Sequence, residues 1–186
     1  AIGNDVTLNN ASNDFDSDDN DDTVTVTGKD VNIRNSDAFN LGAQTISGNL
    51  TVQAGGSIED GGVMDVEGTT TLTATGRVNM NNNGSDYTGP VNVTAEGGKI
   101  SLKDDNDIEL GTISSAGTFS LTASRTTTGT VTQSGTITVA NRTAITNSGG
   151  DVTLNNENND FGDGSSTNDV QVTAANVSIK NSETLE

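Results

Sequence analysis

The aspartates around and after Phe15 are the residues whose type and spacing come closest to a metal site. Carboxylates recur there at Asp14, Asp16, Asp18 and Asp22. Carboxylate oxygens at alternate positions are hard ligands of the kind that calcium prefers, although the stretch lacks the glycine and glutamate of an EF-hand loop. A solvated acidic bulge is the simpler interpretation. Calcium is the alternative, and no other cofactor is predicted.

A second acidic cluster, Asp104, Asp105 and Asp107, precedes the apolar Ile108. Two nearby carboxylates can act as the acid and base of glycoside hydrolysis. No aromatic residue that could stack on a sugar lies nearby, and Lys103 is the only basic neighbour in sequence. The chain also has no His and no Cys, so the usual nucleophile–base pairs are missing. We therefore expect a protein that is not an enzyme.

A short strand, an Asn-rich corner and an aromatic residue recur three times. The stretch 5–15 returns almost unchanged at 151–161, and 77–87 is a more divergent copy. Asn tolerates left-handed backbone, and its amide can bond to an adjoining segment. We therefore interpret these residues as structural corner and core positions: Asn9, Asn10, Phe15, Asn81, Asn82, Tyr87, Asn155, Asn156 and Phe161.

The composition is unusual for a folded domain. Only 30 % of the residues are apolar and the net charge is −18, values that would suit a disordered chain. Val, Ile and Leu nevertheless alternate with Thr, Ser and Asn, which indicates strands. With 8 Lys and Arg in total, the chain is not expected to bind nucleic acid. It also lacks an apolar run long enough for membrane insertion.

The strands that must position these residues are short and regularly interrupted. Apolar pairs at i and i+2 are broken every few residues by Gly, Asn or Asp. The three corner copies divide the chain into units 5–77, 78–150 and 151–186 of one segment, 1–186. An antiparallel sandwich would normally carry more Pro and aromatic residues. We therefore predict an all-β parallel β-helix, or solenoid, of roughly nine coils of about 20 residues each.

Several recurring phrases carry a family resemblance. Gly150–Asn156, Asn159–Phe161, Leu110–Ile113 and Gly129–Ile137 resemble the stalk repeats of filamentous-haemagglutinin-type adhesins, large bacterial exoproteins of two-partner (type Vb) secretion. The resemblance implies a right-handed β-helix displayed outside the outer membrane. Because the chain starts and stops inside repeat units, we expect it to be a fragment of a longer protein.

The function that the resemblance implies is structural. We expect a non-enzymatic stalk segment of a secreted surface adhesin, extracellular at the bacterial cell surface, which presents a distal binding region and supports cell–cell or cell–surface adhesion. Its neighbours would be further β-helix coils of the longer chain. A host or cell-surface receptor or glycan would be bound by other parts. The alternatives are a carbohydrate-active β-helix module and a calcium-stiffened matrix or biofilm protein.

Overall fold

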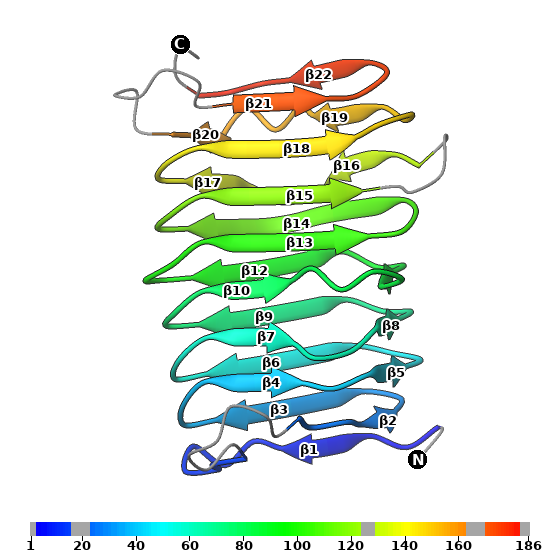
Figure 1. Ribbon diagram of the computed structural model, residues 1–186, viewed down its shortest axis with the longest axis vertical. Coiled ribbons are helices and arrows are strands. Elements are labelled where there is room, and N and C mark those ends of the chain that lie inside the picture. Colours follow the sequence, from blue (N-terminus) through cyan, green and yellow to red (C-terminus); the bar gives the residue numbers. More distant parts are fainter. Residues whose placement is uncertain (1–2, 16–22, 124–128, 163–169, 183–186) are drawn as a thin grey trace.

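The computed structural model describes residues 3–15, 23–123, 129–162 and 170–182. Within these ranges every helix-or-strand element is a β-strand, and all strand pairs are parallel. No helix that could cross a membrane occurs among these residues. The strands stack coil upon coil into a rod (Figure 1). The predicted all-β parallel solenoid is confirmed.

Three faces make up the wall of the rod, and the chain visits them in the order one, two, three. Face one contains β1 (Val6–Leu8), β3 (Val31–Asn35), β6 (Leu50–Ala54), β9 (Thr70–Ala74), β12 (Val91–Ala95), the second half of β14 (Ile108–Ser115), β17 (Ile137–Val139) and β20 (Asp160–Phe161).

The other two faces are built in the same way. Face two contains β4 (Phe39–Leu41), β7 (Ile58–Asp60), β10 (Val78–Met80), β13 (Ile100–Asp104), β15 (Phe119–Ala123), β18 (Thr143–Asn147) and β21 (Val170–Thr173). Face three contains β2 (Thr27–Gly28), β5 (Gln44–Ile46), β8 (Met64–Val66), β11 (Asp86–Tyr87), the first half of β14, β16 (Val131–Gln133), β19 (Val152–Leu154) and β22 (Val177–Ile179).

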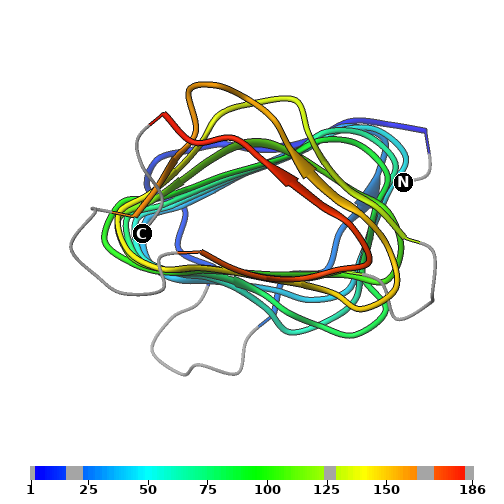
Figure 2. The same cartoon turned by 90° about the horizontal axis from the view of Figure 1, so that it is seen from above.

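The long strand β14 turns a corner and therefore belongs to two faces. Its first half pairs with β16 and its second half with β17. This strand joins face one to the later strands of face three, β16, β19 and β22, in one hydrogen-bonded sheet of 11 strands among the described residues. The earlier strands of face three form a separate sheet of four, and face two is a sheet of seven. Seen along the axis, the coils superimpose in one flattened outline (Figure 2).

The rod makes about seven turns of about 21 residues, so the expected number of roughly nine coils is too high. The pairing register shows why. Val6 pairs with Val31, whereas Val31 pairs with Leu50, so the first of these coils is clearly longer than the second. Long corners add residues to a coil without adding a turn, so division of the chain length by a coil of about 20 residues overestimates the number of turns.

The core is a narrow stack of aliphatic side chains that point inward from all three faces. On β6 the residues alternate between buried and exposed along the whole strand. Inward residues of successive coils lie in register, as in the ladder Ile33, Val52, Leu72, Val93, Ile113 and Ile137. Each is at most 1 % exposed, and full burial of such a side chain stabilises by about 1.5–3 kcal/mol. A thin core therefore suffices for a chain that is only 30 % apolar.

The three similar stretches lie on three different faces. β1 is on face one, β10 on face two and β19 on face three. From each copy to the next, the chain completes three turns and then passes on to the following face. The corner that follows each of these strands therefore occupies a different edge of the rod.

Candidate functional site

The first Asn corner joins two coils through side-chain hydrogen bonds. Asn13 Nδ2 donates to Leu8 O at 2.8 Å and to Arg34 O, one coil further along, at 3.2 Å. The backbone N–H of Phe15 donates to Asn35 Oδ1 at 2.9 Å. Two asparagine side chains thus close the corner and bond it to the next coil.

The third corner repeats this arrangement on another edge. Asn159 Nδ2 donates to Leu154 O at 3.3 Å and to Lys180 O at 3.2 Å. The N–H of Phe161 donates to Asn181 Oδ1 at 2.9 Å. All of these residues keep the same spacing from their counterparts in the first corner. The two nearly identical stretches therefore make the same hydrogen bonds.

The middle corner uses different residues for the same task. Ser85 takes the place of the asparagine, and its Oγ accepts from Met64 N at 3.1 Å. The N–H of Tyr87 donates to Asp104 Oδ2 at 2.9 Å. An aspartate thus stands where the other two corners have an amide.

The asparagines singled out from the sequence lie at the outside of these corners. Asn9, Asn10, Asn81 and Asn155 are exposed, and Asn82 and Asn156 are half-buried. Asn10 Oδ1 and Asn156 Oδ1 each accept a backbone N–H two residues further on. Asn156 Nδ2 also donates to Gly135 O on the adjoining coil, at 3.3 Å. The other bonds between coils at these corners come from Asn13, Asn35, Asn159 and Asn181, which were not among the predicted corner positions. The signal for Asn13 and Asn159 was the recurrence of Asn two positions before the aromatic residue in the first and third copies.

The three aromatic residues differ in burial. Tyr87 and Phe161 are 1 % and 2 % exposed. Phe15 is half-buried, and its ring lies against Phe39 with the centroids 6.0 Å apart. Burial raises the pKa of Tyr87, and the carboxylates of Asp60 and Asp104 raise it further. The phenol therefore stays neutral.

Acidic side chains gather at the middle corner. Asp104 is 1 % exposed and accepts a second N–H, from Asn106, at 2.8 Å. Burial raises the pKa of Asp104 to about 6, and the nearby Asp86 and Asp105 also act to raise it. A buried carboxyl whose protonation changes near neutral pH is a feature that catalytic sites share.

A half-buried carboxylate, Asp60, lies on the coil before the middle corner. Its oxygens accept from Asn81 N at 3.2 Å and from Asn82 N at 2.7 Å. Burial raises the pKa of Asp60 as well. Asp60 and Asp104 therefore both accept backbone N–H groups of the middle corner, one from each side.

The suspected carboxylate pair does not converge on a shared cavity. Asp107 Oδ1 accepts from the N and Oγ1 of Thr130, at 2.6 and 2.9 Å. Asp104 instead faces Tyr87 and Asn106. These two carboxylates serve different parts of the wall, and neither they nor Asp105 lines any of the hollows described below.

The calcium hypothesis rests largely outside the described residues. Asp16, Asp18 and Asp22 lie there, and the described Asp14 is exposed. Within the described ranges, no three His, Cys, Asp or Glu side chains are placed to hold a metal ion. Calcium binding by the stretch from Asp14 to Asp22 stays a prediction.

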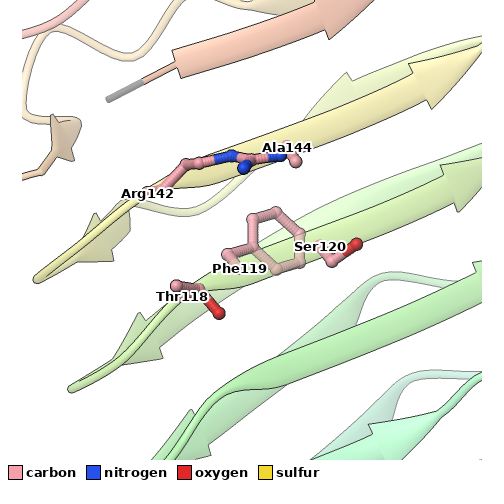
Figure 3. A pocket seen from close by; sticks show the side chains of 5 residues that line it. All are labelled: Thr118, Phe119, Ser120, Arg142 and Ala144. Atoms are coloured by element: carbon pink, nitrogen blue, oxygen red, sulfur yellow. The ribbon is translucent and has the colours of Figure 1, made fainter. Parts of the chain in front are cut away.

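Two hollows in the described part of the wall are open to solvent rather than enclosed. One lies over Phe119 between β15 and β18 and is lined by Thr118, Phe119, Ser120, Arg142 and Ala144 (Figure 3). The Phe119 ring itself belongs to the core and is 0 % exposed. A larger hollow follows the register-paired hydroxyls Thr94, Ser114 and Thr138 to Asp160. Short hydroxyl side chains of this kind offer hydrogen bonds but little enclosure.

Parallel strands stacked coil upon coil define the class of this molecule, a β-solenoid repeat protein. The chain belongs to the DUF5649 family, whose description is repeats of unknown function. The family model matches residues 28–94 and 97–168. No curated protein and no solved structure gave a significant match.

Proposed function

We propose that this chain is a structural stalk segment of a large secreted bacterial surface adhesin, of the filamentous-haemagglutinin type that its phrases resemble. The observation that carries the proposal is the unbroken stack. Face two runs through seven parallel strands from β4 to β21, with each strand bonded only to the coils before and after it. Such a rod can be lengthened by further coils without any new kind of contact. Length with stiffness is what a spacer needs.

The surface supports a spacer more than a receptor-binding tip. The outward residues are mostly Thr, Ser, Asn and acidic residues, and the net charge is −18. Like charge of this size keeps a protein soluble and discourages adhesion to anionic surfaces. In this proposal the segment lies outside the cell, and a receptor or glycan is bound elsewhere on the longer protein. Lateral contacts between many such rods would add weak multivalent adhesion.

Immunogold electron microscopy on intact source cells tests the proposal. An antibody raised against this chain should label unpermeabilised cells at a narrow range of distances from the outer membrane. Pre-incubation of the antibody with the purified chain is the control and should abolish the label. Label that appears only after permeabilisation would overturn the surface location. Label spread evenly through the surrounding matrix would overturn the stalk.

A further inference from the structure

At three corners, the inward polar residue that ends the strand makes the same kind of hydrogen bond. Asn35, Ser115 and Asn147 are 2 %, 3 % and 0 % exposed. Each donates a side-chain hydrogen bond to a backbone carbonyl three or four residues further along the chain. The bonds are Asn35 Nδ2 to Ala38 O (2.7 Å), Ser115 Oγ to Thr118 O (3.2 Å) and Asn147 Nδ2 to Asp151 O (3.1 Å).

Asp104 is also an inward residue that ends a strand at a corner. When it is ionised, however, its side chain cannot donate a hydrogen bond to a backbone carbonyl. It ends β13, is 1 % exposed, and its carboxylate accepts from Tyr87 N and Asn106 N. The carbonyl three residues on belongs to Asp107. A carboxylate has no proton to donate to that carbonyl, whereas a carboxylic acid has one.

Within the described ranges, no Lys or Arg forms an ion pair with Asp104 to compensate its charge. Asp86 on β11 and Asp105 in the corner after β13 bring like charge toward it. On the adjoining coil of face two, Asp104 pairs with the uncharged Ala123. Lys103 donates to Asn83, and none of the ion pairs among the described residues includes Asp104. The ionised form is therefore held by two amide N–H groups against burial and like charge.

We propose that Asp104 makes the corner after β13 responsive to pH. In mild acid its carboxylate takes up one proton and donates it in a hydrogen bond to Asp107 O. The corner then has the same pattern of hydrogen bonds as the corner at Asn35. The proton comes from solvent, and no covalent bond changes other than the O–H bond formed. The middle of the rod then becomes more stable as the pH falls.

The direction of the pH dependence follows from the raised pKa of Asp104. Its value of about 6 in the folded chain lies above the ordinary 3.8. A group of this kind contributes stability that is fully present below the unfolded value and is lost as the pH rises through about 6. Relative to an amide at this position, the wild-type chain should gain about tenfold in folding equilibrium constant between pH 8 and pH 5.

Urea denaturation at pH 5 to 8 tests this inference, well above the sequence pI of about 4.1. The wild-type chain is compared with Asp104→Asn, which should lose the tenfold gain, and with Asp105→Asn, which should keep most of it. Relief of the overall negative charge affects all three alike and cancels in the difference. Parallel pH profiles for the wild type and Asp104→Asn would overturn the proposal.

A direct titration makes the proposal independent of the variant's folding. The side-chain ¹³C carboxyl resonance of Asp104 in the wild-type chain should titrate with a midpoint near 6. A midpoint at or below about 4, the ordinary range of Asp, would overturn it. Should Asp104→Asn fold poorly, Asp104→Ser supplies the hydroxyl that Ser115 uses and should likewise remove the pH dependence.

Discussion

Phe161 donates its backbone N–H to Asn181 Oδ1, 2.9 Å away on the next coil. Phe15 makes the same bond, at the same distance, to Asn35 on a different edge of the rod. The bond fixes an aromatic residue of one coil to an asparagine of the following coil, which ends β3 in the first case and lies two residues after β22 in the other. Each of these Asn corners thus helps to set the register of the neighbouring coil.

Asn159→Ala should be among the most destabilising polar substitutions. Asn159 is 0 % exposed, and its Oδ1 accepts from Ile137 N at 3.0 Å. Its removal leaves buried N–H and C=O groups without partners, at a cost of about 2–4 kcal/mol. Urea denaturation should show this loss. Asn13→Ala, at the half-buried counterpart, is the matched control and should lose less. Equal losses at the two sites would contradict the argument from burial.

Phe119→Ala should open a cavity in the middle of the stack. The ring is 0 % exposed, and loss of a fully buried Phe costs about 3–5 kcal/mol. Phe15→Ala, at a half-buried ring on the first coil, should cost only about 1–2 kcal/mol. Thermal and urea unfolding of the two variants measure the difference. A Phe15→Ala variant as unstable as Phe119→Ala would show that the first coil carries more of the core than its burial indicates.

Gly55→Ala tests how closely neighbouring coils approach at the corners. A Cβ at this position would lie 1.9 Å from Ser36 O, a backbone atom. The coils would have to move apart, and we expect a loss of about 2–3 kcal/mol in the free energy of unfolding. Gly84→Asn is the control, because Gly84 has a φ of +89°, which Asn tolerates, and a Cβ there meets no atom closer than 3.8 Å. If Gly55→Ala is as stable as the control, the coils are not in tight contact there.

Calcium binding by the first acidic stretch makes a separate prediction. If Asp14, Asp16, Asp18 and Asp22 hold an ion, calcium at a hundred times its Kd should stabilise the fold by about 2.7 kcal/mol. Calorimetric melts with calcium and with chelator measure this, with magnesium as the ionic-strength control. Asp18→Asn should remove the shift. Superimposable melts in calcium and chelator would reject the calcium hypothesis and leave the solvated bulge.

The fold class could be predicted because it depends on local pattern. In β6, Leu50, Val52 and Ala54 alternate with Thr51 and Gln53, and this alternation alone requires one buried face. Recurrence of the Asn corners then indicated stacking rather than hairpins. The candidate site was harder to predict from the sequence. In the sequence, nothing set Asp104 apart from its neighbours Asp105 and Asp107, because neither its burial nor its bond to Tyr87 is visible in the residues around it.

The sequence by itself determined the strands, their inward faces and the parallel stack, since period-two alternation is a property of neighbouring residues. Only the tertiary structure decided which face each copy occupies and which side chains meet between coils. The reason is the length of the corners. The coil from Val6 to Val31 is longer than the coil from Val31 to Leu50. Because coil length varies in this way, the spacing of the copies in the sequence does not show that each copy lies one face further round the rod than the copy before it. The pairing of β10 with β13 one turn later brings Asp104 against the middle corner, where burial rather than residue type sets its chemistry.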